Sequence, residues 1–479
     1  MNLPKLYDPT WDSLSKHHTP QWFKDAKFGI YTHWGIYCVP ARGKNATWYP
    51  YNMYREGNPQ YEYHLAMYGG PAKFGYKDFI PQFTAEKFDP DEWADLFKYS
   101  GAQFAGPVGE HHDGFCMWDT QYSEWSAAKM GPKRDVVGLL EKSIRKVGMR
   151  FLVALHHAEN WWFYPHWRKE FDTADPRYTG LYGDLHNMDG PINDDWFFNQ
   201  DRPSKKFMET WKGKILEVID RYSPDMLWFD NGMSGVPEQY KQEFLAYFFN
   251  HAVEYEKEVV VTYKSFDLAP GPGVIDLELG RMDHLTYHEW ITDTTIDDGS
   301  AWGYIKEAKY KSTTTLVHYL VDNVSKNGYL LLNVGPKPDG TLPGEAVEVL
   351  KGIGDWMRVN SEAIYGTVNW ITYGEGPNKI LKAGEFNEKE VPVFDRKDVR
   401  FTTKGDALYA IFLGWPGDNA CIETLKCLYS KEIKSVKMLG VDQELDWELT
   451  SSGLVIKVPA KKPCEHAYVF KIIRGQPYP

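Results

Sequence analysis

The chain has 479 residues, which is enough for a large domain and a smaller one, since domains usually run to roughly 100–200 residues. Lys and Arg number 54 and Asp and Glu number 66, so the net charge is −12, which argues against nucleic acid or an anionic membrane as the main partner. No apolar run approaches the roughly 20 residues of a membrane-spanning helix, so we expect no membrane segment.

Eight apolar, β-branched or aromatic segments are predicted to be strands. They are residues 27–35, 102–115, 150–157, 225–231, 258–264, 273–278, 284–290 and 329–336. Amphipathic patterns predict helices over 89–102, 136–149, 205–224, 237–257, 311–328 and 345–366. Strands that alternate with helices are typical of a parallel sheet, and about eight such units predict an α/β fold of the (β/α)₈-like, TIM-type barrel class.

The pattern changes past about residue 370, where short stretches alternate apolar and polar residues between turn signals. The clearest of them are residues 399–416, 435–441, 453–460 and 466–473. This pattern predicts a small C-terminal antiparallel β-sandwich. We therefore expect a catalytic barrel domain over residues 1–368 and a β-sandwich domain over residues 369–479.

The N-terminus and the cysteines bear on the cellular compartment. The first twenty residues contain no basic segment followed by an apolar one, so no signal peptide is visible. The five cysteines are an odd number and include no CxxC pair. Together these features predict a reduced, cytoplasmic chain, and a chain with its secretory signal trimmed would look the same.

Polar residues gather at the predicted strand ends, where a TIM-type barrel places its active site. They are His33, Trp34, Glu110, His111, His112, Asp113, His156, His157, Trp228, Asp230, Asp276, Glu278, His288 and Glu289. Asp230 is the most informative, because a deeply apolar segment, MLWF, leads directly into its carboxylate. We expect all of these side chains to face one mouth of the barrel.

Two kinds of chemistry fit such a rim. A metal site would use His and Asp, but the chain has no HExxH and no spaced cysteine set, and adjacent residues such as His111 and His112 point to opposite faces of a strand. Glycoside hydrolysis needs two carboxylates beside the scissile bond, and the high aromatic content of 16 % suits sugar binding. We favour the second, and expect no metal. Ser234 in NGMSG does not match the GxSxG of Ser–His–Asp hydrolases.

Several segments, in order along the chain, resemble the retaining α-L-fucosidases of glycoside hydrolase family 29. They are AKFGIYTHWGIYCVP, EHHDGFCMWDTQYSEWSA, DMLWFDNG, NVSKNGYLLLNVGPKPDGTLP and VNSEAIYGT, and VRFTTKGDALYAIFLGWP resembles the start of that family's C-terminal β-sandwich. The resemblance covers roughly residues 20–415. It implies a (β/α)₈-like barrel with a β-sandwich, exo-α-L-fucosidase activity, no cofactor, and a fucosylated oligosaccharide or glycoconjugate as substrate.

The resemblance also implies roles for individual residues. Asp230, which ends the WFD segment, matches the family nucleophile. The residues that match fucose-binding positions are His33, His111, His112, Trp228 and the pair Trp48 and Tyr49. The acidic residue that often precedes this Trp-Tyr pair is Thr47 here, so one carboxylate contact to fucose is missing at that position.

The acid/base residue has two candidates. Some family members carry it directly after a Trp that corresponds to Trp290, where this chain has Ile291, which cannot transfer a proton. Other members use a motif like DYERG, which IDLELGR matches, and this motif gives Glu278. Glu289, directly before Trp290, is the second candidate. We favour Glu278.

Two other functions stay open at this point. One is a fucose-binding protein that has lost its acid/base residue, which Ile291 suggests, and turnover of an aryl α-L-fucoside would separate it from an enzyme. The other is a glycosidase for a related sugar such as an α-L-galactoside. The sequence leaves open the preferred linkage and the oligomeric state, a homo-oligomer included.

Overall fold

A closed barrel of eight parallel strands forms the first part of the chain. The computed structural model describes residues 6–186, 202–299, 301–427 and 432–475. The barrel strands are β1 (Phe28–Thr32), β2 (Phe104–Glu110), β3 (Arg150–Leu155), β4 (Met226–Phe229), β5 (Val260–Lys264), β6 (Val274–Asp276), β7 (Trp290–Thr295) and β8 (Gly328–Val334). Each strand pairs in parallel with the next, and β8 pairs with β1, which confirms the predicted barrel.

The predicted strand over residues 284–290 is wrong. β7 begins where that segment ends, at Trp290, and all six of its residues are buried. Its polar side chains are satisfied inside the barrel: Thr292 Oγ1 donates to the Leu277 carbonyl at 2.5 Å and Thr295 Oγ1 donates to Asp297 at 2.6 Å. Because Thr and Asp replace the apolar residues of an ordinary buried strand, the hydrophobic pattern gave no sign of β7.

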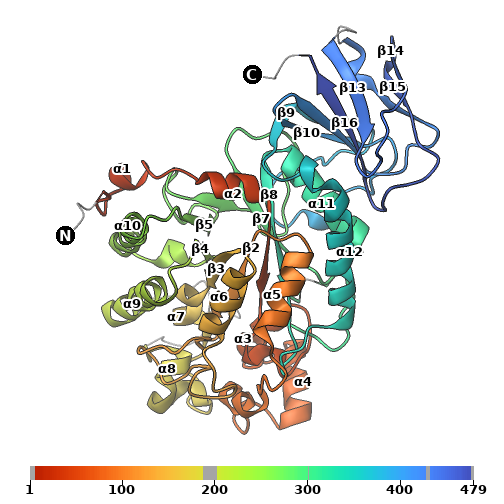
Figure 1. Cartoon of the computed structure of the whole chain (residues 1–479). Helices are drawn as coiled ribbons and strands as arrows, with labels where there is room; N and C mark the ends of the chain where they lie inside the picture. Colours follow the sequence, from red (N-terminus) through yellow and green to blue (C-terminus); the bar gives the residue numbers. More distant parts are fainter. Residues whose placement is uncertain (1–5, 187–201, 300, 428–431, 476–479) are drawn as a thin grey trace.

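Helices surround the barrel (Figure 1). The long ones are α4 (Pro59–Tyr68), α5 (Pro90–Tyr99), α6 (Val136–Lys146), α9 (Lys205–Tyr222), α10 (Glu238–Glu254), α11 (Thr313–Ser325) and α12 (Gly344–Asn360). The short ones are α1 (Trp11–Leu14), α2 (Gln21–Ala26), α3 (Tyr49–Asn52), α7 (Asn160–Phe163) and α8 (Thr179–Tyr182). Residues 265–273 and 277–289, all described, contain no helix, so the loops after β5 and β6 are irregular. Within the described ranges, no helix has both the length and the apolar character that crossing a bilayer requires.

The C-terminal strands form two antiparallel sheets in a separate lobe beside α11 and α12 (Figure 1). One sheet has the order β13-β16-β11-β10-β9 and the other β12-β15-β14. Their bounds are β9 Val368–Glu375, β10 Val399–Lys404, β11 Ala407–Phe412, β12 Asn419–Ile422, β13 Ile433–Met438, β14 Trp447–Thr450, β15 Gly453–Lys457 and β16 Tyr468–Arg474. Phe401 and Leu408 of one sheet share a buried core with Ile422 and Ile456 of the other, as a β-sandwich requires.

The connection between β9 and β10, residues 376–398, runs back to the barrel. Gly384 exchanges backbone hydrogen bonds with Arg281, with N···O distances of 3.0 and 3.1 Å. The backbone N–H of Phe386 donates to the Glu278 carbonyl at 2.8 Å. The C-terminal region therefore holds the loop that follows β6, which carries one of the predicted catalytic residues.

Candidate active site

Asp230 lies at the carboxyl end of β4, directly after Phe229. Its backbone N–H donates to the Leu155 carbonyl at the end of β3, at 3.4 Å, so the residue is tied to two strands. Its side chain is 16 % exposed, and its Oδ2 atom lies 3.4 Å from His112 Nε2 and 3.8 Å from His156 Nε2. The structure thus brings together the predicted nucleophile and the strand-end histidines.

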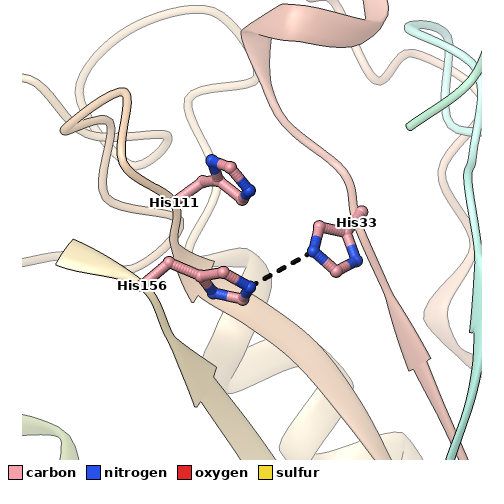
Figure 2. A group of neighbouring side chains, drawn as sticks. All are labelled: His33, His111 and His156. Atoms are coloured by element: carbon pink, nitrogen blue, oxygen red, sulfur yellow. Dashed lines mark hydrogen bonds between the residues drawn. The ribbon is translucent and has the colours of Figure 1, made fainter. Parts of the chain in front are cut away.

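Three imidazole rings from the ends of β1, β2 and β3 converge (Figure 2). One of them, His156, has its Nε2 atom 3.8 Å from Asp230 Oδ2. We call His33, His111 and His156 the histidine trio. His33 Nδ1 lies 2.9 Å from Asn333 Oδ1, an acceptor, so that nitrogen carries the proton. His33 Nε2 is then the acceptor for His156 Nε2 at 3.3 Å. Burial lowers the pKa of all three rings, to about 4 for His33, so the trio is neutral at neutral pH.

The histidine trio has two chemical uses. One nitrogen from each ring lies within 4.8 Å of the others, a spacing that suits a metal ion. Neutral imidazoles also donate to and accept from hydroxyl groups, and His111 Nδ1, though buried, has no hydrogen-bond partner in the described part of the chain. A ligand with hydroxyl groups would therefore satisfy a ring atom that the described residues leave unpaired.

His111 and His112 lie on the same side of the mouth. The expectation that strand alternation separates them is wrong, because β2 ends at Glu110 and both residues lie beyond it. Their ring centroids are 4.3 Å apart. Trp48 lies against the same cluster, with its ring 5.3 Å from that of His112. The Trp228 ring lies 5.0 Å from that of His156, and its Nε1 donates to Asp276 Oδ2 at 2.5 Å.

His112 connects Asp230 to a second carboxyl group, Glu159. His112 Nδ1 donates to the His156 carbonyl at 2.8 Å, and its Nε2 lies 3.2 Å from Glu159 Oε2 and 3.4 Å from Asp230 Oδ2. A ring nitrogen that faces two carboxyl groups needs a proton between them. Burial would lower the pKa of His112, but the two carboxylates outweigh it and raise the pKa to about 9.

Glu159 ends a short 3-10 helix, His157–Glu159, that follows β3. Burial raises the pKa of its carboxyl well above the usual range. Gly232 makes room for it: a Cβ there would lie 2.4 Å from Glu159 Cγ, and its φ of 105° favours glycine in any case. The glycine of the sequence FDNG therefore lets Glu159 pack against the segment that follows β4.

Glu278 lies two residues beyond β6, at the carboxyl end of that strand. Lys264, at the end of β5, is buried, and its Nζ lies 2.6 Å from Asp293, 3.4 Å from Asp276 and 3.6 Å from Glu278. Burial raises the pKa of Glu278 to about 8, against the opposing effect of Lys264 and with support from the charges of Asp293 and Asp230. At neutral pH this carboxyl group holds its proton.

Asp230 has the opposite protonation state. Burial would raise the pKa of its carboxyl, but the hydrogen bond from His112 and the charge of Lys264 lower it to about 2. The mouth therefore holds one ionised carboxylate, Asp230, and two carboxyl groups that keep their proton at neutral pH, Glu278 and Glu159, whose pKa values are both raised to about 8. Pairs of carboxyl groups whose environments move their pKa values apart are the arrangement that acid-assisted nucleophilic catalysis uses.

Two of the predicted site residues lie elsewhere. Glu289 precedes β7, at the end of the barrel where the strands begin, and its carboxylate pairs with Lys24 of α2 at 3.3 Å. Its expected place at the mouth depends on a seventh strand over residues 284–290 and on its closeness to Trp290 and Ile291. Because β7 begins only at Trp290, Glu289 lies at the other end of that strand, and we do not retain it as the second acid/base candidate. Tyr49 is fully buried, and its hydroxyl bonds to His64 Nδ1 at 3.0 Å, so its side chain supports the core rather than the mouth.

Sequence reasoning missed Glu159, Lys264 and Glu385. Lys264 ends an apolar strand, VVVTYK, with a charge, which is the same signal that singled out Asp230. Glu159 lies four residues past its strand on a turn, where no periodic pattern applies. Glu385 lies beside the Glu278 loop because Gly384 and Phe386 pair with that loop, and its Oε1 is buried without a hydrogen-bond partner among the described residues. Only the tertiary structure brings it there.

Comparison with known proteins gave matches over nearly the whole chain. A family model described as alpha-L-fucosidase matches residues 1–362, and one described as alpha-L-fucosidase C-terminal domain matches residues 395–473. Tissue alpha-L-fucosidase of Bos taurus is 32 % identical, over 98 % of this chain and 92 % of that protein, and plasma alpha-L-fucosidase of Homo sapiens is 33 % identical, over 97 % and 92 %. The structure of Thermotoga maritima alpha-fucosidase in complex with a mechanism based inhibitor is 33 % identical and superimposes with a TM-score of 0.78, over 98 % of this chain and 100 % of that one.

Proposed function

The chain belongs to the alpha-L-fucosidase family of glycoside hydrolases, and from that premise we propose that it is a retaining exo-enzyme with Asp230 as nucleophile and Glu278 as acid/base. Its substrate is a fucosylated glycan. The observation that supports the proposal is the opposite protonation of two carboxyl groups that both follow the carboxyl ends of barrel strands, with the pKa of Asp230 lowered to about 2 and that of Glu278 raised to about 8.

In the first step, Asp230 attacks the anomeric carbon of fucose. A carboxylate oxygen forms a bond to C1 while the bond between C1 and the leaving oxygen breaks. Glu278 gives its proton to that oxygen, so the leaving group departs as a neutral alcohol. The strand behind Asp230 and the hydrogen bond from His112 hold the carboxylate in position, which lowers the entropic cost of reaching the attack geometry.

In the second step, the fucosyl-enzyme ester is hydrolysed. Glu278, now a carboxylate, accepts a proton from water while the water oxygen bonds to C1 and Asp230 leaves. Two inversions at C1 give net retention. This mechanism requires the two carboxyl groups to lie about 5–5.5 Å apart in the working complex.

The histidine trio and the two Trp residues recognise the sugar in this proposal. The neutral rings of His33, His111 and His156 offer both donors and acceptors to the fucose hydroxyl groups. Trp48 and Trp228 supply flat apolar surface. No step runs through a metal ion.

Replacement of the nucleophile tests the proposal. Asp230→Gly should cut turnover of an aryl α-L-fucoside by about four or more orders of magnitude, because it removes the covalent path. Azide, a small anion that fits the vacated space, should partly restore turnover and give a fucosyl azide product. Near wild-type activity in Asp230→Gly would refute the assignment of the nucleophile.

A further inference from the structure

Four buried charged side chains meet where the barrel packs against the C-terminal strands. They are Arg281 from the loop after β6, Asp322 of α11, Lys326 directly after α11, and Arg400 of β10. These residues are between 0 and 3 % exposed. We call them the Asp322 cluster. None of them has a role in the proposed reaction, so their burial needs a separate explanation.

Helix α11 brings the cluster together. Tyr319, Asp322 and Lys326 follow one another at helical spacing, so they share one side of the end of the helix. Asp322 accepts from Lys326 Nζ at 2.8 Å and from Arg400 Nε at 2.6 Å. The Arg281 guanidinium lies over the Tyr319 ring, 3.5 Å from its centroid, and Lys326 Nζ donates to the backbone carbonyl that follows Arg281, at 2.9 Å. The loop after β6, helix α11 and strand β10 therefore meet at one point.

The charges of the cluster do not balance, because it has three cations and one carboxylate. Within the described ranges, Asp322 is the one carboxylate that forms an ion pair with these cations, and Arg281 forms none. Burial lowers the pKa of Lys326 and the charges of Arg400 and Arg281 lower it further, against the effect of Asp322. Burial and the same two charges lower the pKa of His318, on the preceding turn of α11, to about 4. Buried positive charge without a counterion is unfavourable, since the ions have lost their hydration.

Arg281 also lacks the hydrogen bonds that a buried guanidinium requires. Its Nε and Nη1 atoms are buried, and neither has a hydrogen-bond partner among the described residues. Stacking on Tyr319 covers the flat face of the guanidinium, but its N–H groups point outward in the plane of the group and stay unpaired. A water molecule would accept these hydrogen bonds and leave the charge unbalanced, whereas an anion would accept them and also reduce the net charge.

We propose that the Asp322 cluster binds a small inorganic anion such as chloride, held by the N–H groups of Arg281. One negative charge would bring the cluster to two anions against three cations. The ion would connect the loop of Arg281 to α11 and β10, and Arg281 lies only three residues after Glu278. Its role is to stabilise the contact between the barrel and the C-terminal strands, so the proposal does not depend on the roles of Asp230 and Glu278.

Thermal unfolding at constant ionic strength tests the proposal. Replacement of sodium gluconate by sodium chloride should raise the melting temperature of the wild-type protein by about 2–4 °C more than that of Arg281→Met, because an ion that binds only the folded state stabilises it. General effects of the two salts act on both proteins and cancel in this difference. Arg134→Met is the matched control and should respond as the wild type does, since Arg134 also lies over an aromatic ring, that of Phe88, and donates to a backbone carbonyl. Equal responses of wild type and Arg281→Met would overturn the proposal.

Crystals of the wild-type protein give a second readout that needs no variant. After a soak in sodium bromide, an anomalous peak should lie at hydrogen-bond distance from Arg281 Nε or Nη1. Density there without an anomalous signal would identify a water molecule and overturn the proposal. A bromide peak without any effect of chloride on the melting temperature would mean binding at crystal concentration only, and would overturn it as well. If Arg281→Met does not fold, Arg281→Gln replaces it in the thermal test, because it keeps an N–H donor, removes the charge and should lose the response to chloride.

Discussion

The proposed nucleophile and the proposed acid/base residue follow strands of the barrel that are built differently. Asp230 directly follows a strand of four buried apolar residues, and the neighbouring strand β3 is apolar and buried after its first residue, Arg150. Glu278 follows β6, a strand of only three residues, and lies beside β7, whose buried residues include three Thr and one Asp. The first carboxyl group is positioned by a strand in the core, and the second by charges and by a loop.

Glu278 and Asp230 also differ in the residues that hold them in position. The loop of Glu278 is paired with residues 384–388 of the C-terminal region, and Lys264 sets the charge balance around it. Glu388 of the same segment pairs with Lys311 at 2.8 Å, which fixes the segment to the start of α11. The acid side therefore depends on residues far apart in the sequence, while the nucleophile side depends on adjacent strands. Mutations around Glu278 and mutations around Asp230 should therefore have different effects on activity and stability.

Loss of the acid is expected to have the largest effect on natural substrates. Glu278→Ala should lower kcat/KM for a fucosylated oligosaccharide by about 10²–10⁴, and should spare aryl fucosides with acidic phenol leaving groups, which depart without protonation. It should also remove the alkaline limb of the pH–rate profile, because the pKa of the Glu278 carboxyl is raised to about 8. Steady-state kinetics with both substrates across pH would measure this.

Two other carboxyl groups serve as comparisons for that variant. Glu289→Ala should leave both substrates and the pH profile unaltered, since Glu289 pairs with Lys24 at the far end of the barrel. Glu159→Gln should slow both substrate types by similar factors. If Glu159→Gln gives the loss that is selective for oligosaccharides, and Glu278→Ala does not, then Glu159 is the acid and our assignment is wrong.

Lys264→Met should lower the stability of the protein by removing the cation beside Glu278. It leaves the buried carboxylates of Asp276 and Asp293 without their cation, which should lower the free energy of unfolding by about 3–5 kcal/mol. The loss should shrink as pH falls, because protonation removes the buried negative charge that the Lys264 ammonium no longer balances. Lys212→Met removes a partly exposed pair with Glu243 and should cost less than about 1 kcal/mol. Similar losses in denaturant titrations of both variants would contradict a buried charge network.

His112→Ala probes the nucleophile side and should have a smaller effect. Loss of the hydrogen bond to Asp230 should lower kcat/KM by a factor corresponding to about 1–3 kcal/mol. Because the pKa of His112 is raised from 6.5 to about 9, its charged form stabilises the fold fully below pH 6.5, and this contribution is lost as pH rises through about 9. The stability difference from wild type should shrink over that interval. A difference that grows with pH would mean that His112 is neutral in the folded protein.

Removal of metal ions should have no effect. The spacing of the histidine trio suits a metal ion, but the proposed mechanism needs only neutral rings that bind hydroxyl groups. Dialysis against EDTA should therefore leave kcat and KM unchanged. A large loss of activity that zinc restores would show that the trio binds a metal ion, and the role of His33 in sugar binding would have to be revised.

The apolar pattern of the sequence is sufficient to predict the strands β1 to β5. β1 to β5 are apolar runs that end in polar residues, and both features are visible without a structure. The same rule placed Asp230 and the histidines at one mouth. It failed for β7, where Thr292 and Asp293 are buried because other groups inside the barrel satisfy them. A buried polar strand cannot be recognised from periodicity, since its partners come from other strands.

The remaining site residues could not be predicted for a related reason. Glu159 lies on a 3-10 turn, and its closeness to Asp230 depends on the glycine at position 232. Glu385 reaches the mouth through backbone pairing between a C-terminal loop and the loop of Glu278. Neither arrangement leaves a local pattern. Lys264 is different: a charge directly after a buried strand is a signal that applies to cations as well as to Asp230.

The stereochemistry of the first product tests the central claim most directly. If Asp230 forms a covalent fucosyl-enzyme and Glu278 activates water against it, the sugar is released with its original anomeric configuration. Proton NMR of a fresh reaction mixture should show the α-anomer of L-fucose first and the β-anomer only later, as mutarotation proceeds. Appearance of β-L-fucose as the first product would mean a single inversion by water, and would contradict a nucleophilic role for Asp230.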